Sequence, residues 1–246
     1  MATAIPVFAD QQYDVRGEDV YRVGSGPETS RVSYDGTQLL AVTHEGKQAR
    51  YDAQARYQRR DAEGKSDARA RFVQELLPNG TFADTLDQDP DFLTVLNQPF
   101  AVQLDAVTMH DLTHLHVQVP FAAASPLGDG AVLRGYLRPG TAGEIGGRPA
   151  ISVRFQAEGP MSGSLPGKAQ LTISGRMRMD GTAYYAVDNA MLLALDATLT
   201  IDAKLKQTAQ TLPVQIVYRR HIRALPKTLP PAQPAAGAGT ASPATP

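Results

Sequence analysis

The sequence predicts a mostly β protein, built as a single curved antiparallel sheet or barrel-like domain with two short helices. Apolar and polar residues alternate with period two through much of the chain, and a strand gathers such apolar residues on one face. The composition, 42% hydrophobic and 20% charged over 246 residues, is that of a folding chain. One alternating run, residues 193–205, is long for a strand of a globular protein, which indicates a strongly curved sheet or a barrel.

The first clear strand lies within residues 48–58, where polar residues alternate with Ala49, Tyr51, Ala53, Ala55 and Tyr57. Although this stretch has a helix-like composition, strict alternation would scatter its apolar side chains around a helix. A turn over residues 61–66 follows. The next strand then brings back, on the same face, Ala68, Ala70 and Phe72.

The second half repeats this alternation in residues 151–158, 171–180 and 193–206. One dry and one wet face is typical of antiparallel sheet. Asp180-Gly181 is typical of a two-residue hairpin turn, and Asp188-Asn189 resembles a second one. These turns predict that Tyr184 lies buried in one row with Met177 and Leu193, and that Tyr185 faces water.

Two short helices are expected near residues 90–97 and 109–116. Asp89-Pro90-Asp91 supplies a capping side chain, a first-turn proline and a carboxylate at the positive end of the helix dipole. Thr108 precedes Asp111 by three residues, which resembles a capping box and makes Thr108 the expected N-cap. Proline at 99 and at 120 would end the two helices.

The predicted antiparallel β domain spans residues 1–225, and residues 226–246 form a disordered Ala/Pro-rich tail. The tail holds six prolines and six alanines but one charged residue, Lys227. Such a segment buries too little apolar area to offset the entropy lost on ordering. Long sheets followed by such a tail favour an exported chain, periplasmic or in the cell envelope with its leader removed, although the compartment is otherwise unknown.

The charge balance and the absence of cysteine exclude several function classes. With 24 basic and 25 acidic residues the net charge is −1, so we expect no nucleic acid as a partner. Without cysteine there is no disulfide, Cys-ligated metal, iron–sulfur cluster or thiol nucleophile. The longest apolar runs, such as residues 191–195, are too short for a transmembrane helix. We expect no cofactor.

The histidine-rich segment, residues 110–116, is the sharpest candidate for chemistry. On a helix His110 and His114 share one face and suit a metal, whereas His116 points elsewhere and the Glu of a two-His zinc helix is missing. The alternative is a capped surface helix with solvated histidines. We favour the second interpretation and assign no metal ligand.

Three further segments resemble binding motifs but lack residues that those motifs require. Asp87, Asp89 and Asp91 alternate like calcium ligands, but Phe92 and Gln98 stand where a glycine and a Glu are required. Residues 159–168 resemble a phosphate loop, yet Ser162 and Ala169 break the pattern, so a loop between strands is expected. The basic run 219–223 predicts a solvated edge strand. No residue is assigned a catalytic, cofactor-binding or metal-binding role.

Three functions remain open. The first is a non-enzymatic envelope protein that binds an apolar or lipid-like ligand, because curved sheets create concave apolar cavities. The second is a protein-protein interaction or assembly module that uses an exposed sheet face or edge. The third is a hydrolase or metal enzyme centred on residues 110–116. The expected outline is similar to the half-barrels of bacterial envelope lipid carriers, a likeness of architecture that covers no motif and carries over no functional residue.

Overall fold

The structure is a computed structural model that describes residues 11–27, 30–45, 48–76, 86–87, 99–124, 131–165, 168–207 and 210–226. Eleven strands account for most of it. The N-terminal strands are β1 (Gln11–Val23), β2 (Ser30–Glu45), β3 (Gln48–Asp61), β4 (Gly64–Leu76) and the two-residue β5 (Leu86–Asp87). The C-terminal strands are β6 (Val119–Ala124), β7 (Val132–Ile145), β8 (Arg148–Leu165), β9 (Lys168–Ala186), β10 (Leu192–Gln207) and β11 (Gln210–Ala224).

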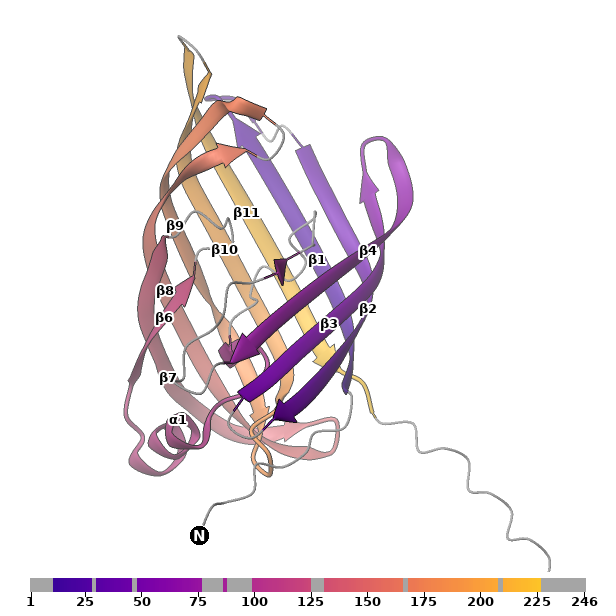
Figure 1. Cartoon of the computed structure of the whole chain (residues 1–246), viewed down its shortest axis with the longest axis vertical. Coiled ribbons are helices and arrows are strands. Elements are labelled where there is room, and N and C mark those ends of the chain that lie inside the picture. The colour runs from indigo at the N-terminus through magenta and orange to yellow at the C-terminus, as the bar shows by residue number, and fades with distance from the viewer. Residues whose placement is uncertain are drawn as a thin grey trace, which may run out of the picture.

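The strands form one antiparallel sheet in the order β5-β4-β3-β2-β1-β11-β10-β9-β8-β7-β6. Neighbours in the sheet are neighbours in the chain, except at the centre, where β1 pairs with β11 and Gly17 lies opposite Arg220. The sheet curls so that β3 and β4 pass in front of β10 and β11 (Figure 1). Within the described residues its two outermost strands, β5 and β6, do not pair with each other, so the sheet is curved but not closed.

Alternation predicted the buried face correctly along most strands. On β8 the side chains of Ile151, Val153, Phe155 and Ala157 are buried, whereas those of Arg154 and Glu158 are exposed. On β3 and β4 the same face buries Tyr51, Ala53, Ala55, Tyr57 and Ala70. The hairpin joining β3 and β4 turns at residues 62–63, within the predicted 61–66, and sets Ala55 opposite Ala70 on the shared face. The mostly β, curved-sheet prediction is therefore confirmed.

The predicted hairpin at Asp180-Gly181 is wrong, because β9 continues straight through both residues. Gly181 serves a close approach instead of a turn. A Cβ there would lie 2.2 Å from the backbone oxygen of Asp196 and 2.5 Å from the ring of Phe155. Any side chain larger than hydrogen would therefore push β9 away from its neighbours.

This error reverses the faces of the tyrosine doublet. Along an uninterrupted β9, Tyr185 shares the face of Met177, and its side chain is fully buried while that of Tyr184 is half-exposed. A register shift on β10 between Leu192 and Ala194 then takes Leu193 out of the predicted row. Leu193 packs in a small separate cluster with Ala150 and Ala186.

The second helix begins earlier than the sequence predicts. A 3-10 turn, η1 (Pro99–Ala101), precedes α1 (Ala106–His110), and a π-helical turn, η2 (Asp111–Leu115), continues it. The N-cap is Asp105, not Thr108: Oδ1 of Asp105 accepts hydrogen bonds from the backbone N–H groups of Val107 and Thr108, at 3.0 and 2.9 Å. Asp105 takes the cap because its oxygen reaches two donors of the first turn.

Two expectations lie outside the described residues, namely the helix at 90–97 and the tail at 226–246 beyond its first residue. The division into residues 1–225 and 226–246 therefore stays a prediction. Among the helical segments that the structure describes, none has the length and apolar character needed to cross a lipid bilayer.

Candidate functional site

The concave face of the sheet is a continuous apolar surface. Its buried side chains come from both halves of the chain and belong to one hydrophobic cluster. The β8–β10 wall contributes mainly large side chains, including Phe155, Met161, Met177, Met179, Leu195, Leu199 and Ile201. Burying one such side chain stabilises the fold by about 1.5–3 kcal/mol. The strongest candidate binding surface is therefore also the core.

Residues 99–112 pack against one end of this surface. Phe100, Val102, Leu104 and Leu112 are buried in the same cluster. The ring of Phe100 lies 5.1 Å from that of Phe155, and the Tyr185 hydroxyl donates a hydrogen bond to the Phe100 carbonyl. Backbone hydrogen bonds of 3.0 Å join the Leu104 N–H to Ala190 and the Leu192 N–H to Val102. The segment is thus tied to the sheet by both packing and hydrogen bonds.

One ion pair interrupts the apolar face. Arg220 on β11 donates from Nη1 to Oδ1 of Asp19 on β1 at 2.6 Å, and their side chains are only 1% and 0% exposed. The Tyr34 hydroxyl donates to the other oxygen of Asp19 at 2.8 Å. A buried charge is tolerated only where it is paired and hydrogen-bonded, and both conditions hold here.

Aromatic rings and one glycine surround this pair. The Arg220 guanidinium lies 5.2 Å from the Tyr34 ring centre and 5.7 Å from that of Tyr218, within cation–π range. Burial, and secondarily the nearby Tyr21 and Asp19, raises the pKa of the Tyr218 hydroxyl. A Cβ on Gly17 would lie 3.0 Å from Nη1 of Arg220, so this glycine leaves the space that the guanidinium fills. Sequence analysis missed the pair because its members lie 201 residues apart.

The basic run 219–223 does not form an edge strand, which corrects the prediction. It lies in β11, at the centre of the sheet between β1 and β10. Arg219 and Arg223 are exposed on the convex face, Arg220 is buried on the concave face, and each contacts a carboxylate on a neighbouring strand. The positive charges therefore hold strands together here.

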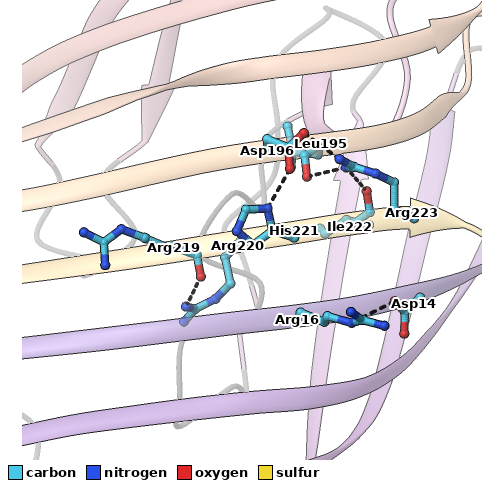
Figure 2. Close-up of polar contacts among 9 residues, drawn as sticks. All are labelled: Asp14, Arg16, Leu195, Asp196, Arg219, Arg220, His221, Ile222 and Arg223. Atoms are coloured by element: carbon cyan, nitrogen blue, oxygen red, sulfur yellow. Dashed lines mark hydrogen bonds and ion pairs between the residues drawn. The ribbon is translucent and has the colours of Figure 1, made fainter.

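Ion pairs cover the convex face of the central strands. Arg223 donates to Oδ2 of Asp196 at 2.7 Å, and Nδ1 of His221 lies 2.6 Å from Oδ1 of the same carboxylate (Figure 2). Burial alone would raise the pKa of Asp196, but these two hydrogen bonds outweigh it and hold that pKa below its usual range. Glu18 likewise contacts Arg31 at 2.5 Å and Arg219 at 2.6 Å.

The histidine-rich segment forms the exposed end of the α1–η2 run. The His110 and His114 rings stack with centres 4.7 Å apart and planes inclined by 15°. Stacked rings direct their nitrogen lone pairs side by side instead of toward one point, and His116 has a left-handed backbone with φ 52°. Among the residues that the structure describes, no three His, Asp or Glu side chains come together as a metal site. This geometry gives no support to an enzyme centred on residues 110–116.

The remaining motifs separate in the structure. Asp87 of β5 pairs with Phe72 of β4. Asp89 and Asp91 lie outside the described residues. Of the loop predicted at 159–168, residues 159–165 extend β8 and Lys168 begins β9, so the connection is shorter than expected. The elongated strands explain why this segment cannot wrap a phosphate.

A groove of about 650 Å³ lies across the ends of β1, β9, β10 and β11. Arg22 donates to Gln215 at 2.6 Å, and Gln215 donates to Asp202 at 2.8 Å, so much of its polar lining is already hydrogen-bonded. Its lining also includes Lys204, but more of the lining is apolar than polar and comes from residues such as Ala203, Pro213 and Val214.

Comparison with protein-family models finds no matching family, and comparison with curated proteins finds no similar sequence. The candidate site therefore stands on its geometry alone.

Proposed function

We propose that this chain is a non-enzymatic binding protein whose concave face holds an apolar or lipid-like ligand. The observation that carries the proposal is the continuous apolar lining on the inside of a curved sheet whose outermost described strands, β5 and β6, do not pair with each other. Concave, mostly apolar surfaces with few polar groups are the usual form of sites for apolar small molecules.

Two features of this surface support ligand binding beyond simple packing. Four of the chain's six methionines, Met161, Met177, Met179 and Met191, lie in the core cluster. Methionine is flexible and polarisable, and it is over-used on surfaces that adapt to varied apolar partners. In addition, the middle of the inner face of β3 and β4 is built from small side chains, Ala53, Ala55 and Ala70, which lie between the larger Tyr51 and Tyr57. The inner face thus combines a patch of small residues on β3 and β4 with large, adaptable residues on β8 to β10.

The test is titration with N-phenyl-1-naphthylamine, which fluoresces when it enters an apolar site. We expect saturable binding by the wild-type protein and clearly weaker binding by Ala55→Leu, because the added side chain enters the concave face. Gln54→Leu is the matched control, since it places the same side chain on the opposite face of the same strand. Thermal melts of both variants check that they fold, because overpacking costs about 1–3 kcal/mol.

Equal binding of the probe by the wild type and by Ala55→Leu would contradict the ligand proposal. Absence of saturable probe binding by the wild type would contradict it as well. Native mass spectrometry of the gently purified protein is the second measurement. A retained apolar molecule supports the proposal and gives the ligand's mass.

The proposal places this function in the cell envelope or periplasm. Its support is the Ala/Pro-rich composition of residues 226–246 together with the long sheet, both typical of exported proteins. Cell fractionation tests it. Recovery of the protein only from the cytoplasm would contradict export without touching the ligand proposal.

A second function, binding of another protein through a sheet edge, is favoured by a specific observation. Among the residues that the structure describes, only Phe72 and Val73 of β4 pair with β5, and β6 covers β7 only from Val132 to Leu137. Exposed strand edges are natural sites for a partner's strand.

A further inference from the structure

The outer edge of β4 offers backbone groups for pairing. On one side β4 pairs with β3 along its whole length. On the other side, among the described residues, β5 pairs only with Phe72 and Val73. The stretch from Gly64 to Arg71 therefore has one row of backbone N–H and C=O groups that no described strand covers. Such a row is a template for an added strand.

The convex face beside this edge carries positive charges without carboxylate partners. Arg56 on β3 lies directly opposite Arg69 on β4, and Arg60 lies opposite Lys65. Arg56, Lys65 and Arg69 are exposed and form no ion pair or hydrogen bond within the described chain. Arg60 donates only to the amide of Gln58, at 3.2 Å. The one carboxylate in this group is Asp67, which lies opposite Gln58.

Other arginines of the same hairpin are neutralised. On the same convex face Arg71 contacts Asp52 at 2.7 Å, and Arg50 contacts Glu75 at 2.5 Å. The sheet can therefore provide carboxylates opposite arginines. Like charges placed directly opposite each other destabilise a strand pair, so their presence needs a cause.

Protection against aggregation explains only part of this pattern. Charges on an edge strand discourage edge-to-edge pairing, and Lys65 and Arg69 serve that purpose. Arg56 and Arg60, however, belong to β3, which is covered on both sides by β2 and β4. Positive charges on β3, one strand in from β4, are more than protection of the edge requires. They match a partner that carries negative charge.

We infer that the β4 edge binds an extended partner segment in which acidic and apolar residues alternate. The partner adds as a strand beside Gly64–Arg71. Its carboxylates lie on the convex face near Lys65 and Arg69 and reach Arg56. The inference names the partner of the edge-binding function proposed above and rests on it, while it is independent of the apolar-ligand proposal.

The concave face defines the other half of the partner's pattern. Ser66, Ala68 and Ala70 are the inward side chains of this part of β4, and all three are small. Residues directly opposite on a shared face contact each other, so large apolar residues of the partner fit over these alanines. The position that faces Asp67 takes a basic or neutral residue. A free lipid headgroup or a nucleic acid would use the charges but not the backbone edge.

The test uses fluorescently labelled nine-residue peptides and the full chain. The probe peptide alternates Glu and Val, with Lys in place of the Glu that faces Asp67. A peptide of the same composition in scrambled order controls for charge. A third peptide, methylated on alternate backbone nitrogens, keeps every side chain but cannot pair along the edge. We expect binding of the first peptide alone, measured by fluorescence anisotropy.

The test variant carries Arg56→Gln and Arg69→Gln together. Its matched control is Arg50→Gln, on the same face of the same hairpin. Removing two charge contacts should weaken peptide binding about tenfold. The control should change it less than about twofold, because Arg50 is distant and paired with Glu75. The double variant should melt like the wild type, and the control at the same temperature or slightly lower, because it loses the contact with Glu75.

Equal binding of the scrambled or methylated peptide would overturn the inference, because charge alone would then account for it. Absence of peptide binding, or preference for anionic lipid vesicles over the peptide, would also overturn it. If a native partner still co-purifies with the double variant in wild-type amounts, protein binding stands and only its assignment to β4 fails.

Discussion

Arginines at the β1–β11 seam and arginines on the β3–β4 hairpin belong to the same sheet, yet their surroundings are opposite. At the seam Arg220 is buried on the concave face and held by Asp19. On the hairpin Arg56 and Arg69 are exposed on the convex face, opposite each other, without a carboxylate. Charge at the seam fixes how two strands meet, whereas charge on the hairpin is available to a partner.

The difference in pairing follows from how well solvent reaches each arginine. A buried arginine must be paired because the interior cannot solvate it, so Asp19 and Arg220 specify the register of β1 against β11. An exposed arginine is solvated by water and tolerates a like charge nearby at small cost. Substitutions of the charged residues at the seam should therefore lower the free energy of unfolding far more than substitutions on the hairpin.

The largest effect is expected from Asp19→Ala, which leaves the Arg220 charge buried without its partner. Breaking a buried pair costs about 3–5 kcal/mol of unfolding free energy. The matched control is Glu18→Ala, the adjacent carboxylate on the opposite face, whose exposed contacts with arginine contribute under about 1 kcal/mol. Urea unfolding measures both, and comparable losses in the two variants would contradict the comparison.

Gly17→Ala tests the space around the same guanidinium. The new methyl would lie 3.0 Å from Nη1 and 3.2 Å from Cδ of Arg220, and 3.2 Å from the Tyr34 ring. We expect a loss of about 1–2 kcal/mol from overpacking. Gly26→Ala, where nothing lies within 4 Å, should stay within about 0.5 kcal/mol of wild type. Identical melting of the two variants would show that the seam is not tightly packed.

On the hairpin, removing charge should change the stability in the opposite direction. Replacing Arg56 and Arg69 together by Gln removes a like-charge pair, so stability should be unchanged or raised by less than about 0.5 kcal/mol. Arg71→Gln, which breaks the contact with Asp52, should lower stability by up to about 1 kcal/mol. Differential scanning calorimetry at low salt resolves these changes. A clear loss in the double variant would mean that the two arginines stabilise the fold and are not held for a partner.

The smallest effect is a pH dependence at Asp196. Its pKa is lowered in the folded protein by Arg223 and His221, and exposure to solvent keeps the effect small. A lowered folded pKa stabilises the protein above the unfolded value, near pH 4, and this contribution is lost as the pH falls through the folded pKa. Asp196→Asn should therefore flatten the acid limb of the stability curve slightly. An unchanged acid limb would show that the pairs of Figure 2 do not couple to folding.

Local patterns predicted the strands well because alternation reports which face each residue takes, and the sheet buries one face throughout. The inward residues of β3, β8 and β10 between 195 and 203 could be identified in this way. Turn signals were less reliable, because those at 61–66 and at Asp188-Asn189 do mark turns but a third does not. Asp180-Gly181 has the sequence of a hairpin turn, but Gly181 is required by its close contact with Phe155 and Asp196, which no local pattern reveals.

Properties that depend on the order of the strands could not be predicted. The run 219–223 reads as an edge because its charges suit one, and only the pairing of β1 with β11 places it at the centre. The same pairing creates the Asp19–Arg220 contact. The unpaired cations of the hairpin also emerge only from register, because Arg56 and Arg69 become opposite when β3 and β4 align.

The position of β1 beside β11 bears on how the chain folds. This is the only strand pairing in the described sheet that joins residues far apart in sequence, because all the others join consecutive strands. At its end the Leu225 N–H donates to Gln12 at 2.8 Å, so the two ends of the sheet-forming chain adjoin. A circular permutant that begins near Pro99 and ends after β5 would follow the sheet from one edge to the other. Its contact order would be lower, and it should refold faster than the natural order of strands allows.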